Sequence, residues 1–422
     1  DVNGDGYDDV LVGARGADPR GSYSGSSYLV FGGAGGFASN LDLSALDGTN
    51  GFQISGEDEL HQSGHSLSGA GDVNGDGIAD YVVGAWGADD HGVDTGAAYV
   101  VFGRTGGYAS DFDLSALNGV NGFQFIGEAS DDFAGFSAVS GAGDVNGDGY
   151  DDVLVGAFGS DEHGADAGAA YVIYGAAGGF GASLELSALD GFNGFQVSGG
   201  SAADYAGRSV SGAGDVNGDG YSDLVIGAPK TDFAGTDSGA GYVVFGGDFN
   251  GAAHFLGGAG ANRFTGTAAA ERFVGGGGND FMIGGGGADV FRGGAGNDTV
   301  RMNRAAFADI DGGSGSDTLA LNGGIDLDLT AIANSRISGI ETINLGVGAG
   351  ASDLTLSRGD LLDLSDTSNT LKVQGAADDS VTVTDGTWTD TGVAGDFHVY
   401  TLGAARLEIK TAITDVTIAL VD

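Results

Sequence analysis

The sequence lacks cysteine and has only 2 proline residues in 422. Without cysteine the chain forms no disulfide, so an extracellular protein of this composition must be held together in another way. No run of about 18 apolar residues occurs, so the sequence predicts no transmembrane helix and no insertion into a membrane. No signal peptide is visible, and because the chain opens on Asp1 inside a motif we expect a preceding segment.

Positive charge is also scarce. The chain has 59 acidic and 15 basic residues, for a formal net charge of -44. Such a surface repels phosphate backbones, which argues against nucleic acid as a partner. Hard divalent cations, which prefer carboxylate and carbonyl oxygens, are the expected counter-charge. Acidity that serves solubility or a salty habitat would explain the sign of the charge but not where the charges lie.

Glycine, in contrast, is abundant. The 87 glycines would suggest a disordered linker, but 41% hydrophobic residues argue against disorder. Glycine at fixed spacing marks turns that need a positive φ. A chain of this length is expected to hold two or three structural units, built from short strands and tight turns.

The string Asp-Val-Asn-Gly-Asp-Gly occurs four times, at intervals of 71, 72 and 71 residues, which indicates a repeat architecture. Four short β-branched or aromatic runs bounded by glycine accompany each copy and predict four strands per repeat, as in a propeller blade. In the second repeat these runs are 64–68, 81–85, 99–103 and 122–125. A single blade cannot bury both faces of its sheet, so neighbouring blades are expected to stack.

Each Asp-rich loop places oxygen-bearing side chains at positions 1, 3, 5 and 9, and position 7 offers a backbone carbonyl. Five or more oxygens around one point suit Ca²⁺, so we predict about four ions in these loops. The predicted ligands are Asp1, Asn3, Asp5, Tyr7, Asp9; Asp72, Asn74, Asp76, Ile78, Asp80; Asp144, Asn146, Asp148, Tyr150, Asp152; and Asp215, Asn217, Asp219, Tyr221, Asp223.

Two other interpretations of the loops fit the sequence less well. An EF-hand needs Glu at position 12 and flanking helices, whereas position 12 here is Val or Ile inside a predicted strand, which excludes it. An ion-free Asp/Asn/Gly turn would bring carboxylates together uncompensated. At an effective dielectric near 20, each pair about 4 Å apart costs roughly 4 kcal/mol, so the empty loops are expected to be poorly ordered.

With its Phe245-Gly246 and Gly227-Ala228-Pro229 segments, the repeat resembles the FG-GAP repeat of integrin alpha-subunit propellers over residues 1 to about 250. The resemblance implies a propeller with calcium between the first two strands of a blade. Such propellers usually have seven blades, whereas this sequence carries about four. Whether these blades close into a ring is therefore left undecided by the sequence. The repeats are lengthened by an insert such as Leu114–Gly119.

From Gly257 the period changes to nine residues: a Gly-rich turn closed by Asp, then a three-residue strand with an apolar centre. A flexible glycine linker would not keep Asp at one phase. These residues resemble the RTX repeats of proteins exported by type I secretion, which implies a parallel β-roll over 251–320 with several Ca²⁺ ions. The predicted ligands there are Asp280, Asp289, Asp298 and Asp317.

Residues 321–422 carry short alternating runs, which predict a continued β-solenoid or a small β-domain. The stretches 364–371 and 397–400 resemble C-terminal regions of large bacterial RTX adhesins, which implies a role in export or anchoring. The predicted fold class is therefore all-β throughout: propeller blades, a parallel β-roll and a C-terminal β-rich region.

Other motifs are weaker. Arg358-Gly359-Asp360 is an integrin-ligand tripeptide, but in a Gly/Asp-rich chain it arises easily by chance and it lies in a predicted strand region. His61 and His65 are not expected to converge on a metal from a strand or loop. His91 and His163 occupy equivalent repeat positions beside acidic residues, where a second ion site or a solvated loop both fit. The sequence lacks His-Glu-x-x-His and Gly-x-Ser-x-Gly, so we predict no enzyme.

The leading functional hypothesis is an extracellular, calcium-dependent adhesion or surface-binding protein of bacterial type, exported by type I secretion. Its expected partner is a cell-surface protein or polysaccharide, or copies of itself. The alternatives are a self-assembling structural protein of a surface layer, sheath or matrix, and the non-catalytic portion of a larger secreted hydrolase.

Overall fold

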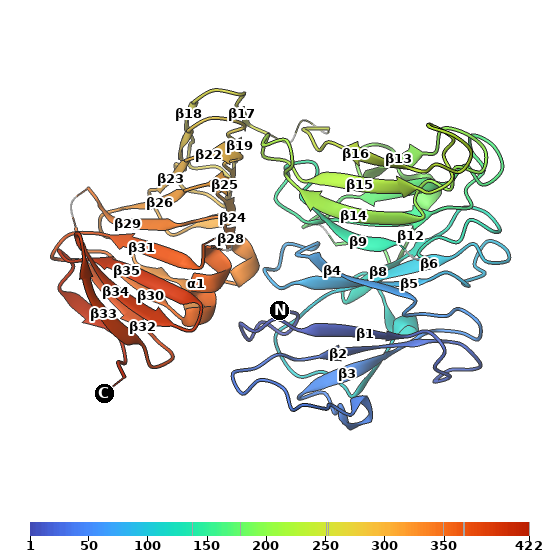
Figure 1. Ribbon diagram of the computed structural model, residues 1–422, viewed down its shortest axis with the longest axis horizontal. Helices are drawn as coiled ribbons and strands as arrows, with labels where there is room; N and C mark the ends of the chain where they lie inside the picture. The colour runs from blue at the N-terminus through green and yellow to red at the C-terminus, as the bar shows by residue number, and fades with distance from the viewer. Residues whose placement is uncertain are drawn as a thin grey trace. The chain divides into compact units, whose positions relative to one another are not determined.

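The computed structural model describes residues 1–136, 138–177, 179–249, 251, 253–348, 350–365 and 368–421. Ser137, which lies in the first predicted strand of the third repeat, and residues 366–367 of the C-terminal stretch lie outside these ranges. The chain divides into two compact units. Unit 1 holds Asp1–Asn146, Tyr150–Val216 and Ser222–Asn250, and unit 2 holds Gly147–Gly149, Asn217–Tyr221 and Gly251–Asp422. The predicted all-β fold class is confirmed, because strands dominate both units (Figure 1).

Unit 1 consists of four successive blades, each an antiparallel sheet that follows the 71-residue repeat (Figure 1). The blades are β1 (Val10–Ala14), β2 (Ser26–Val30), β3 (Gly51–Ser55); β4 (Ser66–Gly71), β5 (Asp80–Ala85), β6 (Ala97–Val101), β8 (Gly122–Ile126); β9 (Val139–Gly143), β10 (Asp152–Ala157), β11 (Ala169–Ile173), β13 (Gly194–Ser198); and β14 (Ser209–Gly214), β15 (Asp223–Ala228), β16 (Ala240–Val244).

In the second and third repeats, a short strand just before the insert joins the preceding blade. β7 (Asp111–Asp113) adds to β3 of the first blade and β12 (Ser183–Glu185) adds to β8 of the second, both in parallel. A 3-10 turn occupies the same point of each of the first three repeats. These turns are η1 (Leu43–Ala45), η2 (Leu114–Ala116) and η3 (Leu186–Ala188).

The core of unit 1 lies between the blades, as expected for sheets that are apolar on both faces. In β5, Tyr81 and Val83 pack in the cluster that contains residues of the first blade, such as Phe52. Val82, which points to the other face, packs with Val153 and Val155 of the third blade. Alternate residues of one strand thus serve two interfaces, because successive side chains of a strand point to opposite faces.

Unit 2 is a parallel β-solenoid in which two nonapeptides make one turn, since Met282 pairs with Val300 in the next turn. Its long sheet runs β18 (Arg263–Thr265), β20 (Phe281–Ile283), β23 (Thr299–Met302), β26 (Thr318–Asn322), β29 (Thr342–Val347), β31 (Thr370–Gln374), β35 (Ala405–Lys410), β34 (Phe397–Leu402) and β33 (Thr389–Ala394). The facing sheet runs β17 (Phe255–Leu256), β19 (Arg272–Val274), β21 (Asp289–Arg292), β24 (Phe307–Asp311) and β28 (Ile337–Ser338).

The solenoid continues through the C-terminal region. A further parallel sheet runs β27 (Leu327–Asp328), β30 (Asp353–Leu356), β32 (Ser380–Val383) and β36 (Asp415–Thr417), and a short one pairs β22 (Ala295–Gly296) with β25 (Ser314–Gly315). The remaining elements are η4 (Leu329–Ala331), η5 (Asn334–Arg336) and α1 (Arg358–Leu364). Of the two forms left open by the sequence, the structure therefore shows the continued solenoid, which ends in the antiparallel strands β33 to β35.

Candidate calcium sites

In the first two propeller loops, the first Asp holds the loop in a tight coil. In the second loop, the carboxylate of Asp72 accepts the backbone N–H of Gly75, Asp76 and Gly77 at 2.7–3.0 Å. Gly75 and Gly77 have φ values of +76° and +87°, a left-handed conformation that favours glycine. Asp1 makes the same three bonds in the first loop, to Gly4, Asp5 and Gly6.

Positions 3 and 5 accept hydrogen bonds in the same manner. Oδ1 of Asn74 accepts the N–H of Asp76 at 2.8 Å, and Oδ1 of Asp76 accepts the N–H of Ile78 at 2.9 Å. The loop therefore gathers three oxygen-bearing side chains around a run of backbone amides within seven residues. For the position-7 residues the predicted use of the carbonyl stays a prediction.

The Asp at position 9 has a structural task that the sequence analysis missed. Oδ2 of Asp80 accepts the N–H of Val73 in its own loop, and Oδ1 accepts the N–H of Gly103 at the end of β6, both at 2.9 Å. Asp80 is fully buried, and this burial raises its pKa to about 8. The equivalent carboxylates bond to the same two positions: Asp9 to Val2 and Gly32, Asp152 to Val145 and Gly175, and Asp223 to Val216 and Gly246.

The second N–H belongs to the glycine of the Phe-Gly or Tyr-Gly pair that follows each loop, and glycine is required there because a Cβ at Gly103 would lie 2.3 Å from the carbonyl oxygen of Ala79. The glycine lies 23 residues after the Asp in every repeat, so the regular spacing in the sequence was the available signal.

The donor chemistry of the loops fits calcium, although their carboxylates are turned toward amides. Within the described ranges no three His, Asp or Glu side chains are grouped as a metal site. Each loop nevertheless supplies three carboxylates and one amide oxygen. In the second loop Oδ1 of Asp72 accepts two N–H groups, but Oδ2 accepts one and keeps a second lone pair for a cation. Calcium, with six to eight oxygen ligands in flexible geometry, suits such a set.

In the β-roll the four predicted Asp residues are almost fully buried, with exposures of 0–2%. Oδ1 of each accepts a backbone N–H from the preceding turn: Asp280 from Asn262, Asp289 from Glu271, Asp298 from Asp280, and Asp317 from Asp298, at 2.6–3.0 Å. Oδ2 of each is buried without a hydrogen-bond partner. A buried carboxylate oxygen in this state is costly unless a cation lies beside it, so the roll fits calcium by its unsatisfied oxygens.

Burial also sets the protonation of these groups. Desolvation raises the pKa of Asp298 to about 6 and that of Asp317 to about 7, and it raises the pKa of Asp280 and Asp289 as well. Without a cation these carboxylates therefore hold protons more tightly than an exposed Asp does.

The structure adds residues to the roll that the sequence analysis did not name. Glu271 is 6% exposed and its carboxylate accepts the N–H of Thr267 at 2.9 Å. Glu271 and Asn262 stand nine and eighteen residues before Asp280, in the position that Asp takes in the regular copies. The nonapeptide phase could have identified both. Glu341 extends this series of carboxylates by one turn, because its carboxylate accepts the N–H of Asp317 at 2.8 Å.

The histidines do not form a metal site in the described structure. Nδ1 of His91 lies 3.1 Å from the carbonyl of Gly127, and Nδ1 of His163 lies 2.9 Å from that of Gly199. His91 also lies 3.4 Å from Glu185. Both rings thus contact equivalent backbone positions in successive repeats, which accounts for their periodic placement.

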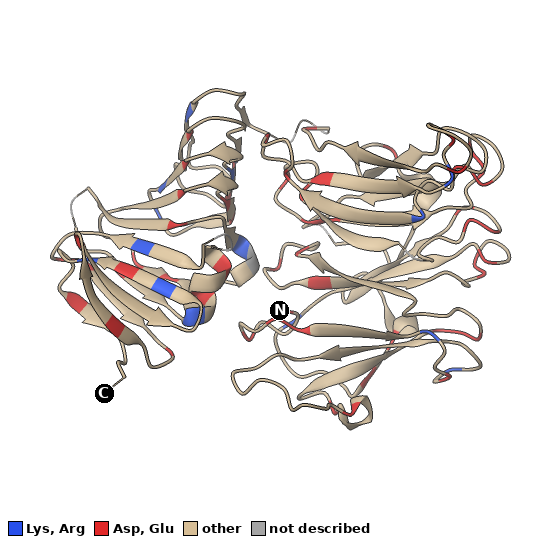
Figure 2. Cartoon of the chain, in the orientation of Figure 1, with Lys and Arg blue, Asp and Glu red and all other residues tan. Residues whose placement is uncertain are grey.

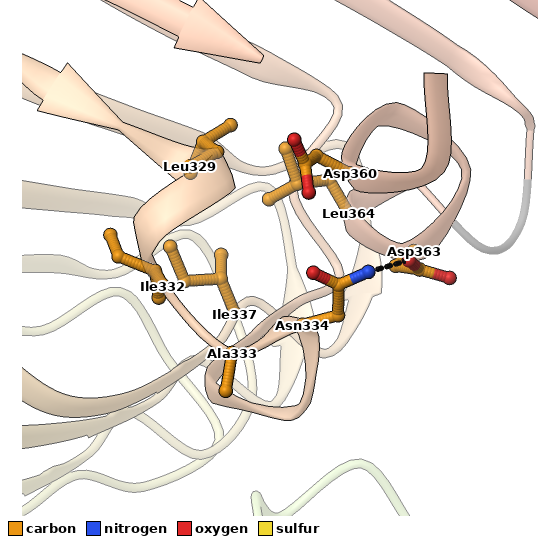
Figure 3. A pocket seen from close by; sticks show the side chains of 8 residues that line it. All are labelled: Leu329, Ile332, Ala333, Asn334, Ile337, Asp360, Asp363 and Leu364. Carbon is orange, nitrogen blue, oxygen red and sulfur yellow. Dashed lines mark hydrogen bonds between the residues drawn. The ribbon is translucent and has the colours of Figure 1, made fainter. Parts of the chain in front are cut away.

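The Arg358-Gly359-Asp360 tripeptide was predicted in a strand region, and that prediction is wrong. The tripeptide forms the first turn of α1, where Ser357 and Asp360 make a reciprocal capping box. Asp360 is 7% exposed and faces a cavity of about 10 Å³ lined by Leu329, Ile332 and Leu364 (Figure 3). That volume is about one water molecule, so the carboxylate serves the helix and is not displayed to a partner.

Comparison with known proteins agrees with both repeats. The model of the FG-GAP repeat matches residues 1–30, 136–173 and 206–244, and that of the RTX calcium-binding nonapeptide repeat matches 248–282 and 265–300. The chain is 31% identical over 167 residues to integrin alpha-5 of Xenopus laevis, covering 38% of this chain and 14% of that protein. It is 31% identical over 172 residues to integrin alpha pat-2 of Caenorhabditis elegans, covering 37% and 12%.

The matched segment spans only a small part of these integrin chains. In the described part of the structure, no helix is both long and apolar enough to cross a membrane. The repeats are of types that are typically non-catalytic, and they suggest a calcium-binding extracellular protein. The chain therefore carries FG-GAP repeats of the integrin alpha type, followed by RTX calcium-binding nonapeptide repeats.

Proposed function

We propose that the protein is a calcium-dependent adhesin that binds a carboxylated cell-surface polysaccharide through unit 1. Residues 1–250 present the binding surface, residues 251–320 fold on calcium outside the cell, and residues 321–422 serve export or anchoring. Calcium occupies the four propeller loops and several turns of the roll, with the predicted Asp and Asn side chains as ligands. Type I secretion of a bacterial protein is consistent with this calcium-dependent folding.

The observation that carries the proposal is a band of half-buried rings at the blade ends that lie away from the Asp-rich loops. The ring of Phe136 contacts His65 at 4.6 Å, Trp86 at 5.0 Å and Phe158 at 5.4 Å. Trp86 directly follows β5, whose other end begins at Asp80, so the band and the loops lie at opposite ends of the strand. Phe133 and Tyr205 extend the band.

Cations gather on the same band although unit 1 is strongly acidic. The guanidinium of Arg208 lies over the rings of Phe136 and Phe158 at 4.7 and 4.8 Å, and Lys230 lies over Tyr205 at 4.8 Å. Arg208 immediately precedes β14, one of the few strands of unit 1 with a basic residue at its end (Figure 2). Burial lowers the pKa of His65, the bond to the carbonyl of Phe136 opposes this, and the positive charges of Arg15 and Arg208 lower the pKa further.

Rings that offer an apolar face beside positive groups suit a sugar chain with carboxylates. Two further observations bear on the band. Phe133 and Tyr205 hold φ values of +55° and +56°, and the equivalent Gln62 of the first repeat holds +53°, so the repeated loop sets this left-handed conformation and thereby the direction of the two rings. Trp and Arg, both present here, are the side chains that most often dominate binding energy at interfaces.

The test measures binding of the labelled protein to uronate-containing and neutral polysaccharides, first with millimolar calcium and then with chelator. We expect saturable binding to the uronate polymers that disappears on chelation. Lys230→Gln should weaken binding several-fold, because it removes an exposed cation from the band. Arg104→Gln is the matched control, since Arg104 is also exposed and stacks on Tyr108 at 4.5 Å but at the other end of the blade. Equal losses in both variants, or no binding by folded protein, would contradict the proposal and favour self-assembly.

A further inference from the structure

The roll ends where its last regular nonapeptide turn stacks on a turn that breaks the pattern. At this point β24 pairs with β28 in the facing sheet and β26 pairs with β29 in the long sheet (Figure 1). The chain therefore crosses between the two sheets through residues 312–317 in one turn and through the shorter segment 339–341 in the next. The strand register gives Glu341 the position of Asp317, although it follows 24 residues later and belongs to no nonapeptide.

The two turns are in close backbone contact around the side chain of Asp317. A Cβ on Gly312 would lie 2.0 Å from the carbonyl oxygen of Gly339 and 2.7 Å from the Cβ of Asp317. A Cβ on Gly339 would lie 3.1 Å from Oδ1 of Asp311. The carboxylate of Glu341 reaches Asp317 from the same turn as Gly339 and accepts its N–H at 2.8 Å. Oxygen atoms of carboxylates and of a backbone carbonyl thus border one small region.

Asp317 itself is the residue that calls for a ligand. It is 1% exposed, its Oδ1 accepts the N–H of Asp298 at 2.6 Å, and its Oδ2 is buried without a hydrogen-bond partner. Desolvation raises the pKa of Asp317 to about 7, the N–H of Asp298 opposes this, and the negative charges of Asp298, Glu341 and Asp311 raise the pKa further. A buried carboxylate oxygen that faces other carboxylates is costly unless a cation lies beside it.

The solenoid does not require an acidic residue in this register position. In the turn after Glu341 the position holds Leu371, which is fully buried. On the side of the roll that carries Asp289, the next turn places Phe307 opposite it, at 7% exposure. Apolar side chains therefore fill the position where the series of carboxylates ends, so the acidic side chain of Glu341 has a task other than packing.

We propose that Asp311, Asp317 and Glu341 form a calcium site at the end of the roll, beyond its last nonapeptide, with the carbonyl oxygen of Gly339 as a further ligand. Within the described ranges the three carboxylates are not grouped as a closed site, because Asp311 and Glu341 each turn one oxygen toward an N–H. Ca²⁺ suits such a set, since it accepts six to eight oxygens, including waters, in flexible geometry.

The proposal rests on the calcium loading of the roll stated above, and it adds a site that the repeat does not encode. Asp311 and Asp317 belong to the last nonapeptide turn, whereas Glu341 directly precedes β29. An ion held by all three joins the roll to the solenoid that follows it. Calcium thereby stabilises the C-terminal region as well, although that region carries no nonapeptide of its own.

The test counts the calcium ions that the full chain binds at equilibrium, by dialysis against buffered free calcium and elemental analysis. Glu341→Gln keeps an acceptor for the N–H of Asp317 and removes the charge, so we expect the fold to be retained. At the lowest free calcium that saturates the parent, the variant should bind about one ion fewer per chain. It should need about tenfold more calcium to regain that ion, because the charge of the ligands sets the affinity of such sites.

Glu408→Gln is the matched control, because Glu408 lies on β35 of the same sheet but pairs with Arg406 at 2.7 Å. This variant should bind as many ions as the parent. If Glu341→Gln also binds as many ions as the parent at the same free calcium, or if both variants lose equally, the proposed site is wrong while the calcium loading of the roll stands. A parent protein that binds no calcium would instead contradict the proposed function, and this site with it.

Discussion

In chelator, the protein is expected to be more stable near pH 5 than near pH 8. Burial raises the pKa of Asp298, Asp317 and Asp80 to about 6, 7 and 8, whereas an unfolded Asp titrates near 3.9. Between the unfolded pKa and the folded pKa values the folded chain binds more protons than the unfolded chain. The free energy of unfolding therefore falls as pH rises through this interval. The loss begins above about pH 4 and is complete once pH exceeds the folded pKa values.

Calorimetric melting at the two pH values, with and without calcium, checks this prediction. Calcium binds the ionised carboxylates and displaces their protons, so in saturating calcium the melting temperature should instead be higher near pH 8. A metal-free protein that melts at a higher temperature at pH 8 than at pH 5 would show that these carboxylates are not destabilising when ionised.

Replacement of Asp298 by Asn is expected to change stability in opposite directions with and without calcium. The amide retains an oxygen that can accept the N–H of Asp280, which Asp298 Oδ1 accepts at 2.6 Å. In chelator at neutral pH the variant should be at least as stable as the parent, because a buried charge with an unpartnered oxygen is gone. In calcium it should be less stable, by roughly 2–4 kcal/mol, because one charged ligand is lost.

Asp379 provides the matched control for this experiment. It is also buried, at 1% exposure, but both of its oxygens have partners: Oδ1 accepts the N–H of Ser352 and Oδ2 that of Ala376, at 2.9 and 2.7 Å. Asp379→Asn should therefore destabilise the protein equally in calcium and in chelator. Denaturant unfolding of the parent, Asp298→Asn and Asp379→Asn proteins gives the comparison. If Asp298→Asn changes the free energy of unfolding equally with and without calcium, Asp298 is not a calcium ligand.

Strands with a distinctive side-chain pattern could be read from the sequence. The second strand of each repeat was predicted within a residue of its observed bounds, because its apolar residues stand between an Asp-rich loop and Gly-Ala. The first strand was predicted too early, at 64–68, whereas β4 covers Ser66–Gly71. Its Gly-Ala-Gly end resembles a turn, but strand pairing uses the backbone, and a bulge between Gly69 and Gly71 accommodates it.

Contacts that depend on tertiary structure were harder to predict. The Asp at position 9 was interpreted as a metal ligand alone, since its bond to a glycine 23 residues later exists only once the blade has folded. The helix at Arg358–Leu364 could have been found, because Ser357 and Asp360 have the spacing of a capping box. The form of the C-terminal region could not, because its parallel strands pair at separations such as Leu354 with Val381 and share no sequence motif.

The most direct test of the central claim, that calcium holds this fold together, is melting of the intact chain followed by far-UV circular dichroism. We expect a high melting temperature in millimolar calcium that increases with calcium concentration, and in excess EGTA a loss of much of the β signal at neutral pH. An unchanged spectrum and melting temperature in EGTA would contradict the account, because the buried carboxylates would then be stable without a cation.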